Sequence, residues 1–163
     1  MKLHLDDTFT SKLRADTALT NDRRQVLNAA YSYVTPRKPA GPQVVHVSEE
    51  MARLLGLTDE DIKSEDFLEI FSGAKVLKNT RPYAMVYGGH QFGNWAGQLG
   101  DGRAINLGEV LHDGKRWALQ LKGAGETPYS RTADGLAVLR SSIREHYGLV
   151  CLTTFPFLDI VQP

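Results

Sequence analysis

Alternating apolar and polar residues in the middle of the chain predict a β-hairpin. Residues 104–111 lead to Asp113-Gly114, a dipeptide that supplies the positive φ angles of a tight hairpin turn. In the return strand, residues 116–122, a tryptophan and two leucines alternate with residues that are mostly polar. Lys122 therefore ends a half-buried strand, and its side chain points away from the apolar face of that strand.

Two further strands are predicted before this hairpin. Residues 43–47 are rich in β-branched side chains, and residues 83–87 combine aromatic and aliphatic ones. Between residues 35 and 42 the prolines favour an extended segment. Ten of the fifteen glycines lie between Gly88 and Gly125, which predicts tight turns or close backbone approaches in that stretch.

Serine caps and glycine stops predict two short helices. The first begins after Ser48, is followed by two glutamates in its positive first turn, and ends at Gly56. The second begins after Ser64 and ends at Gly73. The residues that it is expected to bury are Phe67, Leu68 and Phe71.

An apolar stripe predicts a last helix over residues 134–147, which also carries Glu145. The stripe consists of Leu136, Leu139 and Ile143. After this helix the composition changes, because residues 148–163 contain one charged residue, Asp159, and nine apolar ones. Together these elements predict an α+β chain with a twisted antiparallel sheet and flanking helices.

Composition narrows the class of protein. A chain of 163 residues with 42% hydrophobic and 23% charged residues is expected to form one globular domain. Its 19 basic and 19 acidic residues balance, so nothing in the charge favours nucleic acid or an anionic membrane as a partner. With one cysteine, Cys151, no signal segment and no membrane span, we expect a cytoplasmic protein.

The histidines and the large aromatic residues suggest no functional site. The five histidines show no ligand spacing, so no metal site is predicted from them. The large aromatic residues of the glycine-rich region are expected in the core; they are Phe92, Trp95 and Trp117.

The sharpest feature is a combination of three parts. A glycine-rich turn over residues 97–103 is followed by a strand that ends in Lys122 and by a helix that carries Glu145. Backbone N–H groups freed by glycine, together with a lysine, are suited to binding phosphate. The alternative is structural, since such glycines also permit strand twist and close packing. Spacing alone leaves both interpretations open.

Longer motifs favour the first interpretation. The segments GGHQFGNWAGQLGDGRAINLGE and LQLKGAGETPYSRTADGLAVLRSSIRE, with YSYVTPR and RPYAMVYGGHQFG before them, resemble the selenoprotein O family (SelO, also YdiU) over residues 1–145. The resemblance implies a protein-kinase-like N-lobe and a protein adenylyltransferase, which moves AMP from ATP to Ser, Thr or Tyr hydroxyls of other proteins. ATP and protein substrates are the partners implied, with Mg²⁺ or Mn²⁺ as the cofactor of complete members.

Carried onto this sequence, the resemblance implies a set of ATP contacts. Lys122 is expected to hold a phosphate, with Glu145 as its orienting ion-pair partner, and Arg103 is expected to lie near the polyphosphate. The ATP-binding residues implied are Gly100, Gly102, Arg103, Lys122, Asp134 and Gly135.

The family pattern stops at Glu145. Residues 146–163 form a divergent apolar tail, for which we expect a frameshift, a truncation or a misread gene. In the family, the catalytic aspartate, two phosphate-contacting arginines and the magnesium ligands lie further on, so no catalytic or metal-binding residue is expected in this chain. Three functions follow as hypotheses: part of an adenylyltransferase that is inactive alone, a non-catalytic nucleotide-binding module, or an unstable remnant.

Overall fold

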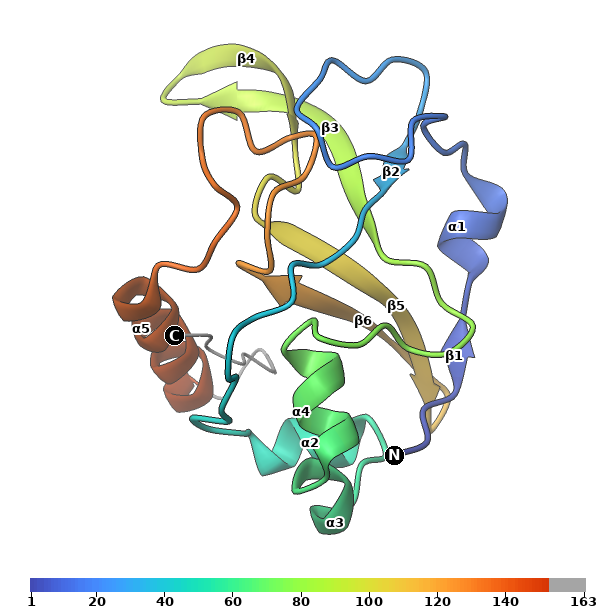
Figure 1. Cartoon of the computed structure of the whole chain (residues 1–163), viewed down its shortest axis with the longest axis vertical. Coiled ribbons are helices and arrows are strands. Elements are labelled where there is room, and N and C mark those ends of the chain that lie inside the picture. The colour runs from blue at the N-terminus through green and yellow to red at the C-terminus, as the bar shows by residue number, and fades with distance from the viewer. Residues whose placement is uncertain (153–163) are drawn as a thin grey trace.

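An antiparallel sheet with helices at one end and along its sides forms the structure, a computed structural model that describes residues 1–152 (Figure 1). This confirms the predicted α+β class. The strands are β1 Leu5–Asp6, β2 Tyr31–Tyr33, β3 Tyr83–Gln91, β4 Asn94–Gly100, β5 Ala104–His112 and β6 Lys115–Lys122. The helices are α1 Thr8–Lys12, α2 Glu49–Leu54, α3 Asp59–Ile62, α4 Glu65–Phe71 and α5 Leu139–Leu152.

The predicted hairpin is the pair β5 and β6. Its strands run in register from Ala104 opposite Lys122 to His112 opposite Lys115, with a bulge between Asn106 and Gly108. Asp113 and Gly114 have φ angles of 47° and 72°, which is the conformation that an Asp-Gly hairpin turn requires. The predicted alternation is also confirmed, because the leucines of β6 are buried while its polar residues are exposed or half-buried.

The glycine-rich region forms a second hairpin that the sequence did not predict. Strand β3 continues to Gln91, and β4 pairs with it from Asn94 to Gly100. Residues 97–100, predicted as part of a turn, therefore lie in a strand, because β3 lies alongside and supplies ladder partners for residues 98–100. The turn itself is shorter and consists of residues 101–103.

The aromatic residues of this hairpin lie outside the core. Phe92 at the β3–β4 turn is fully exposed and Trp95 is 64% exposed, so the expectation that they are buried is wrong. A hairpin that extends beyond the body of the sheet has no second layer to cover its side chains (Figure 1). Trp117 is half-buried and packs against the core.

Both short helices have the predicted caps. The Ser48 hydroxyl accepts a hydrogen bond from the backbone N–H of Met51, and the Ser64 hydroxyl accepts one from Phe67. The predicted stops follow them at φ angles of 76° for Gly56 and 82° for Gly73. Helix α3 between them was not predicted. In α4 the buried residues are Phe67, Ile70 and Phe71, so Leu68 was assigned wrongly.

Two other expectations about secondary structure are wrong. Residues 43–47 are not a strand: Val44 and Val45 are exposed, and no neighbouring strand pairs with them in the described part of the chain. The last helix begins at Leu139 rather than at residue 134. Leu136 instead bridges to Ala124, which keeps that segment extended.

The core lies between the sheet and helices α2 and α4. Its fully buried members include Phe67, Ile105, Leu107 and Val110, each no more than 1% exposed. Among residues 1–152, no helix has both the length and the apolar character needed to cross a membrane.

Two phenylalanine substitutions test this arrangement. Phe67→Ala removes a ring that is 0% exposed, so the free energy of unfolding is expected to fall by about 3–5 kcal/mol. Phe92→Ala removes the same atoms from the exposed hairpin turn and is expected to change the free energy of unfolding by less than about 0.5 kcal/mol. Urea unfolding followed by circular dichroism measures both, and equal losses in the two variants would contradict the fold.

Candidate functional site

Lys122 and Glu145 form an ion pair at the end of β6. Lys122 is the last residue of the strand, and its Nζ contacts Oε1 of Glu145 on α5. Both side chains remain partly exposed, at 34% and 40%. The end of β6 and the helix α5 together bring these two residues side by side.

A second contact attaches the same helix to the body of the protein. His46 Nδ1 and His146 Nε2 lie 2.7 Å apart, and His146 is buried. His146 follows Glu145 directly, so this contact holds the helix against the segment that contains His46. The spacing of the histidines in the sequence did not predict this pair, because the two residues are 100 positions apart.

The turn 101–103 lies beside Lys122. The backbone N–H of Gly123 donates to the carbonyl oxygen of Arg103 at 2.7 Å, and Ala104 is the ladder partner of Lys122. Arg103 is half-buried, and among residues 1–152 its guanidinium makes no hydrogen bond or ion pair. The backbones of Arg103 and Lys122 therefore lie at the same end of the β5–β6 ladder.

Gly100 and Gly102 are required by close packing. A Cβ at Gly100 would lie 2.6 Å from the carbonyl oxygen of Met85 and from the ring of Tyr129, and the φ angle of Gly100 is 146°. A Cβ at Gly102 would lie 2.6 Å from the carbonyl oxygen of Tyr129. Close packing alone thus accounts for glycine at these two positions, so a contact with a nucleotide is not needed to explain them.

Asp101, between these glycines, is a buried carboxylate that the sequence interpretation passed over. It is 8% exposed, and its Oδ2 accepts hydrogen bonds from the backbone N–H of Met85 at 2.9 Å and from Nδ2 of Asn106 at 2.8 Å. Burial raises the pKa of Asp101, and the two hydrogen bonds only partly oppose this. Its ionised form therefore costs stability, and that cost appears as the pH rises through the raised pKa.

The loop after Lys122 carries the remaining predicted residues. The backbone N–H of Gly125 donates to the carbonyl oxygen of Gly135 at 3.1 Å, so the segment around Gly135 crosses directly over the residues that follow the lysine. Gly135 is buried. Asp134 is exposed, and its carboxylate accepts a hydrogen bond from the N–H of Leu136. The structure thus brings Gly135 toward the lysine strand and places Asp134 at the surface.

An N-terminal segment ties this loop to the sheet. Arg24 forms an ion pair with Asp16, whose carboxylate also accepts a hydrogen bond from Ser32, and Ser32 contacts the hydroxyl of Tyr129 at 2.8 Å. Burial would raise the pKa of Asp16, but hydrogen bonds from Arg24 and Ser32 outweigh it and lower that pKa. Gln98 of β4 holds the same segment, since its side chain bonds the backbone of residues 24 and 26.

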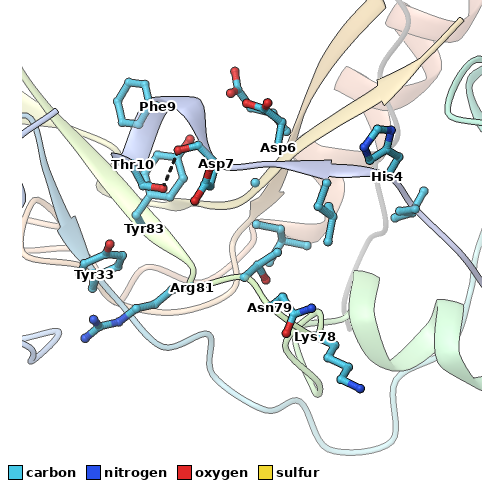
Figure 2. Close-up of a pocket in the computed structure, with 16 residues that line it drawn as sticks. His4, Asp6, Asp7, Phe9, Thr10, Tyr33, Lys78, Asn79, Arg81 and Tyr83 are labelled. Atoms are coloured by element: carbon cyan, nitrogen blue, oxygen red, sulfur yellow. Dashed lines mark hydrogen bonds between the residues drawn. The ribbon is translucent and has the colours of Figure 1, made fainter. Parts of the chain in front are cut away.

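A separate cleft of about 560 Å³ lies on another part of the molecule. It is bounded by β1, by the segment 78–81 and by the start of β3, as Figure 2 shows. Arg116 pairs with Asp6 and with Glu109 at its edge, and burial with the charge of Glu109 raises the pKa of Tyr83 to about 12. None of the predicted site residues lines this cleft, so it is distinct from the Lys122 region.

Comparison with known proteins identifies the family. Residues 14–155 match the family described as "Protein adenylyltransferase SelO", and the chain belongs to this family. Relatives named "Protein nucleotidyltransferase YdiU" include those of Flavobacterium johnsoniae, 63% identical over 144 residues, and of Azoarcus sp., 59% identical over 144 residues. Each of these two matches covers 88% of this chain and 28% of the relative.

A third relative extends the match further along the chain. The protein of the same name from Xanthomonas campestris pv. campestris is 54% identical over 159 residues, which is 97% of this chain and 30% of the relative. The chain thus spans less than a third of the length of these relatives. The resemblance seen in the sequence is confirmed, and the family is one of nucleotidyltransferases.

Alanine at Gly102 tests the tightness of the turn. Gly102→Ala places a Cβ against a backbone carbonyl and is expected to lower the free energy of unfolding by about 1–3 kcal/mol. Gly148→Ala is the matched control, because Gly148 lies within α5 with open space around its Cβ position. There alanine is expected to be neutral or to stabilise by up to about 1 kcal/mol. Thermal unfolding compares the two, and a Gly102→Ala variant as stable as the control would show that the turn is looser than described.

Proposed function

We propose that this chain carries the ATP-binding part of a protein adenylyltransferase, within a kinase-like N-lobe. The observation that supports it is the partly exposed Lys122–Glu145 ion pair beside the turn 101–103. In the proposal, the longer members of the family transfer AMP from ATP to Ser, Thr or Tyr hydroxyls of protein substrates. The single cysteine favours a reducing, cytoplasmic setting for this reaction.

Each residue has a proposed task that follows from its chemistry. Lys122 has three N–H donors, of which Glu145 occupies one, so donors remain for phosphate oxygens. Glu145 orients the ammonium group, and Arg103 adds a guanidinium that can bind a phosphate with two parallel hydrogen bonds. Gly100, Gly102, Asp134 and Gly135 complete the proposed ATP contacts.

The transfer itself needs groups beyond these. A substrate hydroxyl oxygen bonds to the α-phosphorus, the bond from that phosphorus to the bridging oxygen breaks, and pyrophosphate leaves while the hydroxyl proton passes to a base. Within residues 1–152 no group of three acidic, histidine or cysteine residues could hold a metal ion. Mg²⁺ in nucleotide sites is bound by one or two carboxylates together with phosphate oxygens and water, so the metal of the proposed reaction would be held largely by the ATP phosphates. We propose that this chain alone binds ATP without transferring AMP.

Lys122→Ala tests the binding proposal. Removing the ammonium group is expected to weaken ATP binding by about tenfold or more, since a charge-assisted hydrogen bond contributes roughly 1.5–3 kcal/mol. Lys115→Ala, at the exposed opposite end of β6, is the matched control and is expected to leave the affinity unchanged. Calorimetric titration with ATP measures both. Equal affinities for the wild type and Lys122→Ala would remove the proposed phosphate contact.

The second test concerns AMP transfer. The purified chain, incubated with ATP labelled in its α-phosphate, Mg²⁺ and a protein extract, is expected to transfer no label above a no-protein blank. A longer relative such as the Flavobacterium johnsoniae protein serves as the positive control. Robust labelling by the chain itself would overturn the proposed inactivity.

A further inference from the structure

We propose that Asp101 is a positioning residue of the nucleotide site: its carboxylate holds the turn 101–103 in the shape that presents Arg103 beside Lys122. This inference rests on the proposed function for its consequence, but its structural part is independent of whether ATP binds. Three sets of contacts support this role.

The first set lies where β4 leaves the sheet. The ladder between β3 and β4 ends with Val86 opposite Gly100. One residue later the N–H of Asp101 donates to the carbonyl oxygen of Met85, while the N–H of Met85 donates to Oδ2 of Asp101, each at 2.9 Å. The carboxylate thus replaces the backbone acceptor that the next ladder residue would have supplied. It lets the chain turn away without leaving a half-buried N–H group unpaired.

The second set connects the turn to the central strands. Oδ2 of Asp101 also accepts from Nδ2 of Asn106, which is 3% exposed on β5. The same amide donates to the carbonyl oxygen of Tyr83 on β3, and its oxygen accepts from Gln120 on β6. One carboxylate oxygen therefore joins the end of β4 directly to β3 and β5, and through the Asn106 amide to β6.

The third set holds the turn from its other side. The Thr127 hydroxyl donates to the carbonyl oxygen of Asp101 at 2.8 Å, and the Ser130 hydroxyl donates to that of Gly102 at 2.5 Å. Thr127 and Ser130 are buried. The carbonyl oxygens of the turn are thereby directed inward and bonded, which constrains the orientation of the peptide units that link Asp101 to Arg103.

These contacts have a consequence at the site. Because Gly123 bonds the carbonyl oxygen of Arg103, the end of the turn and the residue after Lys122 are attached to each other. A turn released from Asp101 would shift Arg103 relative to the lysine. Burial raises the pKa of Asp101, because the ionised carboxylate loses solvation there, so the acceptor oxygen rather than the charge is the feature that holds the turn. An asparagine oxygen could accept the same two hydrogen bonds.

The test compares three variants of the chain with the wild type. Asp101→Ala removes the acceptor, and Asp101→Asn keeps it without the charge. Asp113→Asn repeats the loss of charge at an exposed hairpin-turn residue that also tolerates asparagine. Calorimetric titration gives the affinity for ATP, and hydrogen–deuterium exchange resolved by NMR gives the protection of the amides of Met85, Gly102 and Arg103.

Asp101→Ala is expected to weaken ATP binding about tenfold or more and to speed exchange at those amides, with Asp101→Asn and Asp113→Asn within about threefold of the wild type. The proposal is overturned if Asp101→Ala binds ATP as the wild type does, or if Asp101→Asn is as weak as Asp101→Ala. Should Asp101→Ala not fold, Thr127→Val keeps the carboxylate and releases the carbonyl oxygen of Asp101, although it also removes the hydroxyl that accepts from the N–H of Tyr129. It is then expected to show the same two changes, and unchanged affinity and exchange would refute the proposal.

Failure of the proposed function gives a different pattern. If the folded wild type does not bind ATP, the proposed nucleotide site is refuted together with the task assigned to Asp101 in it. Amide exchange then still decides the structural part: faster exchange in Asp101→Ala but not in Asp101→Asn supports the role of the carboxylate in holding the turn. Unchanged exchange rejects that role.

Discussion

The pairing of β5 with β6 is the constraint on which the candidate site depends. Because Ala104 lies opposite Lys122, the turn that precedes β5 and the lysine that ends β6 must meet at the same end of the ladder. The side-chain period of a strand is two residues, so a shift of one residue would turn Lys122 toward the core and expose Leu121. The buried face of β6 and the Asp-Gly turn both oppose such a shift.

The two halves of the site differ in what they contribute to stability. The turn 101–103 is hydrogen-bonded on both sides and packed against Tyr129. These contacts tie its conformation to the folding of the sheet. The side chains of Lys122 and Glu145 are each more than a third exposed. Ion pairs that are this accessible to solvent contribute only about 0–1 kcal/mol to the free energy of unfolding. A rigid turn beside a solvent-accessible cation is an arrangement suited to receiving an anionic ligand.

The predictions that failed share a cause. Residues 43–47 have the composition of a strand but no partner, while glycine-rich residues 97–100 have a partner and form one. Phe92 and Trp95 were expected in the core because of their size, yet their hairpin extends past the layer that could bury them. In each case the outcome depended on which segment lies alongside, and composition carries no information about that.

By itself the sequence determined the family motifs, the β5–β6 hairpin with its alternating faces, and the caps of α2 and α4. Each of these has a local signal in the sequence: the Asp-Gly turn starts the hairpin, the two-residue alternation sets its faces, and a serine hydroxyl bonds an N–H three residues on at each cap. Only the tertiary structure decided the role of Asp101, whose partner Met85 lies 16 positions away, and the contact of His46 with His146, 100 positions apart. Such contacts follow from the packing of whole elements, because burial decides which distant polar groups must find each other.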